Sequence, residues 1–103
     1  MAAAIAGFKT VVSHDPDFAP GHAALAEAYL LAQEFGSLPR GLAFAKARAA
    51  ADTAIRLDPD LANAQRAQGF IAYWFDHDAP RADAAFRRAL KLASYDPQTH
   101  FWY

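Results

Sequence analysis

Three stretches of the chain repeat one spacing of small, large and helix-breaking residues. Each begins with an alanine, and the matching positions follow four, seven and twelve residues later. The three sets are Ala4, Phe8, Val11 and Pro16; Ala47, Ala51, Ala54 and Pro59; and Ala82, Phe86, Ala89 and Ser94. Steps of four and three place side chains on one stripe of a helix, and proline ends a helix. The spacing therefore predicts an array of similar helical units. Phe8 and Phe86 hold the large position, so we expect both in the core.

Composition excludes several classes of protein. The chain has 103 residues and a net charge of -1, so it has no general attraction to nucleic acid or anionic lipid. Cysteine is absent, which excludes a disulfide framework and fits a reducing, cytoplasmic location. Charged residues interrupt the apolar stretches well before the roughly 20 residues of a membrane span, so no membrane span is expected. The uncapped aromatic end, residues 101–103, suggests a fragment of a longer protein.

Helix start and stop signals divide the chain into five helices and the start of a sixth. The helices are expected over residues 2–13, 18–34, 42–57, 61–75 and 81–93, with the sixth beginning after Pro97. Alternating strand patterns are absent, so the fold class is all-α and the chain forms one domain, 1–103. Glycine, serine and proline are dense between Phe35 and Gly41. That density predicts the longest loop there and makes it the best place for a functional insertion.

A second signature lies on the helices that precede the second and third of these stretches. It is formed by His22, Leu25, Ala26 and Tyr29 in one unit and by Gln65, Gln68, Gly69 and Ala72, with Tyr73, in the next. Together with the alanine, phenylalanine, alanine and proline set, it resembles the tetratricopeptide repeat. That repeat is a helix hairpin with W-x2-L-G-x2-Y on its first helix and A-x3-F followed by P on its second.

The resemblance implies a solenoid of antiparallel helix hairpins. It divides the chain into a half repeat, 1–18, full repeats at 19–61 and 62–96, and the start of another at 97–103. The sequence departs from the family at the first tryptophan place, which holds His22, Gln65 and His100. The unit from Pro16 to Pro59 spans 43 residues instead of about 34, and we assign the extension to the loop 35–41.

In such arrays the first helices line a concave groove that takes an extended peptide or a partner helix. The resemblance places these groove residues at Glu27, Leu30 and Leu31 in one repeat and at Asn63, Arg66, Phe70, Tyr73 and Trp74 in the next, with Ala23 beside them. We expect Glu27, Asn63 and Arg66 to orient the ligand. Specificity is expected where the two repeats differ, because Leu30 and Leu31 stand where Tyr73 and Trp74 stand.

Four aromatic residues lie close together near the end of the fourth predicted helix: Phe70, Tyr73, Trp74 and Phe75. At about 100° per residue they cannot all face one side of the helix. Core packing accounts for Tyr73 or Phe75. We therefore expect Phe70 and Trp74 to face the groove, since exposed aromatic side chains are enriched at interfaces.

Other chemistries have weaker support. The segment Asp76, His77 and Asp78 has metal-ligating residue types, but a turn with an aspartate N-cap accounts for it better. No nucleophile with a partner base and no glycine-rich phosphate loop is present, so no catalytic residue, metal or cofactor is expected. Basic residues decorate the third and fifth helices: Arg40, Lys46, Arg48, Arg56, Arg81, Arg87, Arg88 and Lys91. Asp52 and Asp83 interleave with them, so a solvated face is expected and direct nucleic-acid binding is not.

Three functions remain open. The first is a protein or peptide interaction module without catalysis. The second is self-assembly into a homo-oligomer through the apolar ends, near Phe8 and near 101–103. The third follows from a weaker resemblance, because residues 21–29 and 87–92 are similar to repeat regions attached to bacterial winged-helix transcriptional activators and nucleotide cyclases. It implies the sensory part of a regulator whose active domain lies outside this segment.

Overall fold

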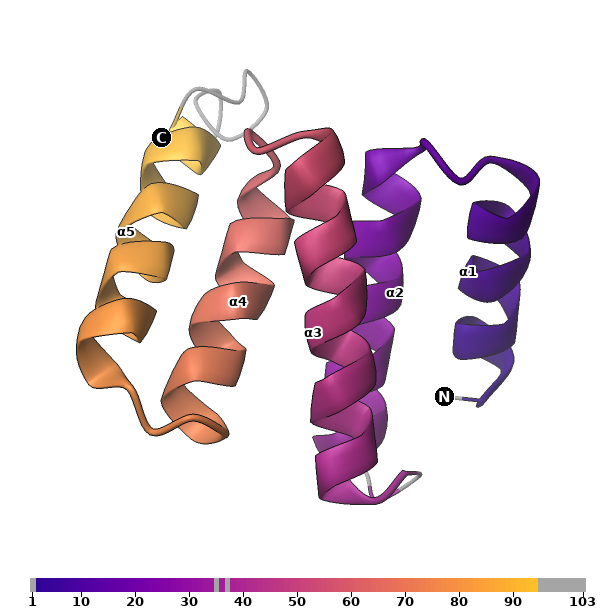
Figure 1. The fold of residues 1–103 in the computed structure, drawn as a ribbon, viewed down its shortest axis with the longest axis horizontal. Coiled ribbons are helices and arrows are strands. Elements are labelled where there is room, and N and C mark those ends of the chain that lie inside the picture. The colour runs from indigo at the N-terminus through magenta and orange to yellow at the C-terminus, as the bar shows by residue number, and fades with distance from the viewer. Residues whose placement is uncertain (1, 35, 37, 95–103) are drawn as a thin grey trace.

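The computed structural model describes residues 2–34, 36 and 38–94, and these form helices joined by short turns, without a strand (Figure 1). The helices are α1 (Ala2–His14), α2 (Ala19–Glu34), α3 (Arg40–Leu57), α4 (Ala62–Trp74) and α5 (Ala79–Ser94). The all-α fold class is confirmed, and each of the five predicted helices ends within two residues of its expected bounds. The predicted start of a sixth helix, at 97–103, lies outside the described residues.

The helix ends follow local chemistry. Asp58, which precedes a proline, leaves the helical region with φ of -152° and ends α3. Gly36 follows α2 with φ of +76°, a conformation that glycine adopts without strain. The Asp78 carboxylate accepts a hydrogen bond of 3.1 Å from the Arg81 backbone N–H at the start of α5. The aspartate N-cap expected in the turn after α4 is therefore confirmed.

Consecutive helices run antiparallel and pack against one another in a row from α1 to α5 (Figure 1). One further contact skips a helix, because α2 also packs against α4. The hairpin α2–α3 therefore contacts the hairpin α4–α5 in two places. Helix α3 packs against α4, and α2 also packs against α4. This meeting of α2 with α4 is what places side chains of the two hairpins on one shared surface.

The core consists largely of alanine, with a few large side chains. The buried residues of α3 are Ala43, Phe44, Ala47, Ala50, Ala51 and Ala54. Short side chains let helices approach closely, and Phe44 supplies the largest fully buried volume. Phe8 and Phe86, expected in the core, are only half-buried. Phe8 packs on the core from α1, at the edge of the row, and Phe86 covers Gly69 from α5.

The turn before α2 and the turn before α4 have the same hydrogen bonds, 43 residues apart. In each, the residue before proline donates its backbone N–H to the carbonyl four residues earlier, at 2.9 and 2.8 Å. His22 Nε2 bonds the Pro16 carbonyl at 2.8 Å, and Gln65 Nε2 donates to the Pro59 carbonyl at 3.2 Å. His22 and Gln65 thus each bind the start of a helix to the preceding proline turn.

The prediction of an extended loop at 35–41 is wrong in its bounds. Helix α3 begins at Arg40, so the segment between α2 and α3 is 35–39. Pro39 precedes the first helical residue, where its fixed φ is compatible with a helix, and Gly41 lies in the first turn. Much of the extra length is helical, because α2 and α3 have 16 and 18 residues against 13 and 16 described for α4 and α5.

Gln65→Ala is expected to lower the free energy of unfolding by about 1–2 kcal/mol. Gln65 is 6% exposed, and its Oε1 also accepts a hydrogen bond of 3.0 Å from Arg88 Nε. The substitution therefore leaves both Pro59 and Arg88 without this partner. Urea unfolding followed by circular dichroism measures the loss, with Arg88→Ala as the control that removes one of the two bonds. Equal urea midpoints for Gln65→Ala and the parent chain would show that the hydrogen bonds of Gln65 to Pro59 and Arg88 do not stabilise the fold.

Candidate binding groove

Five of the eight predicted groove residues line one groove between α2 and α4. The groove has a volume of about 300 Å³ and is lined by Glu27, Leu30, Leu31, Arg66 and Phe70. Leu30 and Leu31 follow Glu27 by three and four positions, and Phe70 follows Arg66 by four, which puts the lining residues of each helix on one face. Ligand sites in proteins range from about 300 to 1,000 Å³. This groove therefore lies at the small end of that range.

The floor and walls of the groove are mainly apolar. Leu30 is 9% exposed and belongs to the core, whereas Leu31 is 44% exposed. Phe70 is half-buried, and it both packs against the core and lines the groove. Leu31 and Phe70 thus offer accessible apolar area from opposite helices, beside the buried Leu30.

One ion pair joins the two sides of the groove. Arg66 Nη2 of α4 lies 2.6 Å from Glu27 Oε1 of α2, and the two side chains are 60% and 36% exposed. Exposed ion pairs of this kind contribute about 0–1 kcal/mol. Two of the three residues expected to orient a ligand therefore bind each other, and a charged partner can replace either of them at small cost.

Tyr73 and Trp74 extend the apolar surface beyond Phe70, and we call these two residues the aromatic edge. They are 49% and 50% exposed. The Trp74 ring centroid lies 6.2 Å from that of Phe70 and 5.0 Å from that of Tyr73, the latter pair edge to face. Trp74 is exposed as expected, but Tyr73 is exposed too. Phe75 stacks on the buried Phe44 at 4.9 Å, although it is still 37% exposed.

Two other residues lie elsewhere. Asn63 is half-buried one turn before Arg66 and does not line the groove. Ala23, which was expected beside the groove, is fully buried against Ala54 and Ala64, so that expectation is wrong. Its small side chain lies where α2, α3 and α4 approach one another closely.

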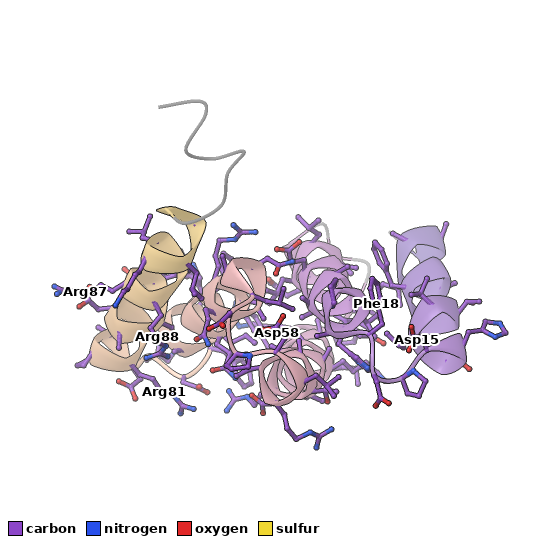
Figure 2. The ribbon with its side chains drawn as sticks, turned by 90° about the horizontal axis from the view of Figure 1, so that it is seen from above. Asp15, Phe18, Asp58, Arg81, Arg87 and Arg88 are labelled. Atoms are coloured by element: carbon purple, nitrogen blue, oxygen red, sulfur yellow. The ribbon has the colours of Figure 1, made fainter. Side chains whose placement is uncertain are left out.

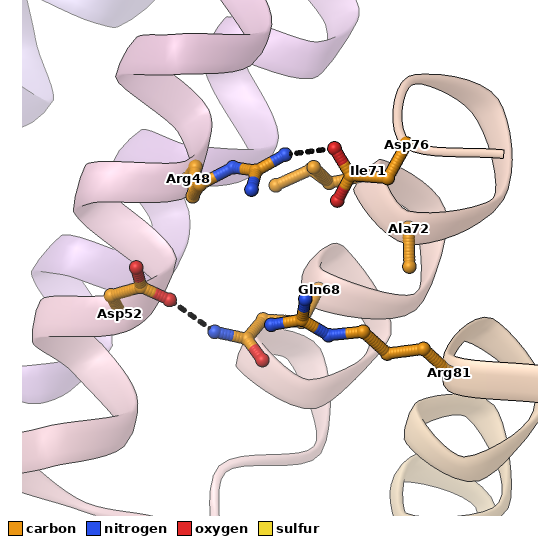
Figure 3. Close-up of a pocket in the computed structure, with 7 residues that line it drawn as sticks. All are labelled: Arg48, Asp52, Gln68, Ile71, Ala72, Asp76 and Arg81. Atoms are coloured by element: carbon orange, nitrogen blue, oxygen red, sulfur yellow. Dashed lines mark hydrogen bonds and ion pairs between the residues drawn. The ribbon is translucent and has the colours of Figure 1, made fainter. Parts of the chain in front are cut away.

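A second cavity lies between α3, α4 and the start of α5 (Figure 3). It is lined by Arg48, Asp52, Gln68, Ile71, Ala72, Asp76 and Arg81, and its volume is about 110 Å³. Arg48 Nη2 lies 2.5 Å from Asp76 Oδ1, and Gln68 donates a hydrogen bond to Asp52. Its two arginines and two aspartates balance in charge, and its two interactions fasten α3 to α4 and to the turn after it. We interpret it as a structural contact.

Arginines of α5 lie at one end of the row of helices (Figure 2). Arg81, Arg87 and Arg88 are all exposed. Arg87 Nε lies 2.9 Å from Asp83 Oδ2, and Arg88 donates to Gln65. Two of the three exposed arginines thus bind neighbouring side chains of the same chain. This agrees with the solvated helix face predicted from the sequence.

Arg40 is the functional candidate that sequence reasoning missed. It was predicted to belong to a solvated basic face, yet its Nη2 donates a hydrogen bond to the Trp74 carbonyl. Its guanidinium carbon also lies 4.9 Å from the centroid of the Phe44 ring. No local pattern connects two residues 34 positions apart, so only the packing of α3 on α4 shows this contact.

Within the described part of the chain, no three histidine, aspartate or glutamate side chains are grouped to hold a metal ion. No described helix combines the length and the apolar character that crossing a membrane requires. Compared with protein-family models, with curated proteins and with solved structures, the chain matches none of them. The groove itself is therefore the basis for a functional assignment.

Proposed function

We propose that this chain is a non-catalytic interaction module of tetratricopeptide-like hairpins that binds a peptide or a partner helix in the groove between α2 and α4. The observation that carries the proposal concerns the groove residues predicted from the repeat resemblance. Five of them line one mainly apolar groove. The matching hydrogen bonds of two turns 43 residues apart support the repeat register from which those residues were chosen.

In this proposal an apolar side chain of the partner inserts between Leu31 and Phe70 above Leu30. Burying apolar surface contributes roughly 25 cal/mol per Å². Tyr73 and Trp74 extend the contact, since aromatic residues often account for much of the binding energy of an interface. Glu27 and Arg66 form a polar rim that favours a partner with charges beside its apolar anchor.

Leu31→Glu is expected to weaken peptide binding at least about tenfold, which corresponds to ~1.4 kcal/mol. The substitution places a carboxylate on the apolar wall, where the bound peptide would desolvate it. The probe is a synthetic peptide chosen from a random phage-displayed library by selection against the parent chain, and calorimetric titration measures its affinity.

Leu42→Glu is the matched control, because Leu42 is 46% exposed, close to the 44% of Leu31, and does not line the groove. Circular dichroism verifies that both variants fold. The proposal requires that only Leu31→Glu lose affinity. Equal affinity of the two variants for the selected peptide would contradict it.

Self-assembly through the ends of the row is a second candidate, favoured by one observation. The outermost helices carry exposed apolar side chains, Val11 on α1 at 41% and Leu90 on α5 at 70%. Light scattering across a dilution series tests this candidate. A mass that falls on dilution supports assembly, whereas a constant monomer mass at every concentration excludes it.

A further inference from the structure

Arg40, the first residue of α3, reaches the last turn of α4. Its Nη2 donates to the Trp74 carbonyl, and its guanidinium lies over the ring of Phe44. Phe44 in turn stacks on Phe75, the residue after Trp74, with the two ring planes 16° apart. One side chain therefore contacts both the backbone of the aromatic edge and the buried ring beneath that turn.

The carbonyl that Arg40 binds belongs to a helix end. Trp74 is the last residue of α4, and carbonyls in the last turn of a helix have no partner within the helix. A cationic donor there satisfies the carbonyl and interacts favourably with the helix dipole. Tyr73 and Trp74 are both about half-exposed, so few side-chain contacts hold them in place. Besides the helix itself and the stacking of Phe75 on Phe44, this hydrogen bond links α3 directly to the backbone of the aromatic edge.

We propose that Arg40 is a positioning residue that holds the aromatic edge, Tyr73 and Trp74, in line with the groove. The proposal rests on the proposed function of the groove. Phe70 provides the connection, because it lines the groove and its ring lies 6.2 Å from that of Trp74. The planar guanidinium donates a hydrogen bond and covers the Phe44 ring at once. Lysine keeps the charge but not this geometry.

The first test uses the free protein. The chain contains two tryptophans, so Trp102→Phe leaves Trp74 as the only one. In that background, acrylamide quenching of Trp74 fluorescence is measured for Arg40→Ala, Arg40→Lys and Arg56→Ala, well below the unfolding temperature. Arg56 is an exposed arginine at the other end of α3 and serves as the control. We expect Arg40→Ala to increase the quenching constant, Arg40→Lys to increase it less, and Arg56→Ala to leave it unchanged.

The second test measures binding of the library-selected peptide by the full chain. Arg40→Ala is expected to weaken affinity about fivefold, the equivalent of one hydrogen bond. Arg40→Lys should lie between it and the parent, and Arg56→Ala should match the parent. If Arg40→Ala does not fold, Arg40→Lys decides both tests.

The outcomes separate the two proposals. Unchanged quenching in the folded Arg40 variants overturns the positioning role, whatever the groove binds. Increased quenching with unchanged affinity also overturns it. In that case Arg40 would hold Trp74 in place, but the position of Trp74 would not affect peptide binding. Full affinity in Leu31→Glu instead contradicts the proposed function of the groove, and the quenching result still shows whether Arg40 holds Trp74.

Discussion

Phe44→Ala is expected to lower the free energy of unfolding by about 3–5 kcal/mol, the usual cost of removing a buried phenylalanine side chain. Phe44 is fully buried and belongs to the cluster that contains Tyr29 and Ile71. Five of the ten buried residues of that cluster are alanines, whose short side chains cannot fill the space that the ring leaves. A domain is typically stable by about 5–15 kcal/mol, so most of the margin is lost. Urea unfolding at 25 °C, followed by far-ultraviolet circular dichroism, measures the effect.

Phe44→Leu is the control for this experiment, because it keeps much of the volume and is expected to cost about 1.5 kcal/mol or less. Phe75→Ala should also cost less than Phe44→Ala, since the Phe75 ring is 37% exposed and loses only part of its contacts. A loss below about 1 kcal/mol for Phe44→Ala would show that the ring is not in the core and that α3 packs differently.

Gly69→Ala is expected to destabilise the chain by about 1–3 kcal/mol, although alanine in place of glycine normally stabilises a helix. A Cβ atom at residue 69 would lie 2.9 Å from Cε1 of Phe86 and 3.0 Å from its Cδ1. The Phe86 ring must turn or shift to make room for this atom, and it then loses part of its packing between α4 and α5. Chemical unfolding of the single variant measures the change in stability and its sign.

Gly7→Ala is the matched control, because a Cβ atom at residue 7 of α1 has nothing within 4 Å and is expected to add about 0.5–1 kcal/mol. Combining Gly69→Ala with Phe86→Leu gives a second check. The smaller side chain makes room, so the double variant should lose less than the sum of the single losses. The described packing of α4 on α5 is wrong if Gly69→Ala stabilises the chain as Gly7→Ala does.

Helix positions were predictable because their signals are local. Asp58 before Pro59 and Gly36 after α2 end helices through their own backbone preferences, whatever the rest of the chain does. The loop prediction at 35–41 failed for a related reason. Proline and glycine break a helix in its middle, but Pro39 is compatible with the position just before a helix and Gly41 with its first turn. The density of such residues does not distinguish these cases.

The composition of the core was only partly predictable. The repeated spacing suggested Phe8 and Phe86, which are half-buried because they belong to the outer helices α1 and α5. Phe44 is the ring that is fully buried. It stands three residues before Ala47 and thus continues the same stripe by one turn, which is the signal that could have identified it.

The groove was predictable where it depends on helix register and was not where it depends on tertiary contacts. Leu31 and Phe70 follow from the faces that α2 and α4 present to each other. The burial of Ala23 and the contact of Arg40 with Trp74 depend on how closely α3 approaches α2 and α4. Long-range approaches of this kind leave no periodic pattern in the sequence.

Binding in the groove is tested most directly by locating the contact surface of the selected peptide through nuclear magnetic resonance. Amide and methyl shifts of the isotopically labelled chain are recorded as unlabelled peptide is added. We expect the largest changes at Leu30, Leu31, Arg66 and Phe70, and we expect these changes to disappear in Leu31→Glu. Changes confined to α1, to α5 or to the polar cavity around Asp52, with the groove residues unperturbed, would contradict the proposed function.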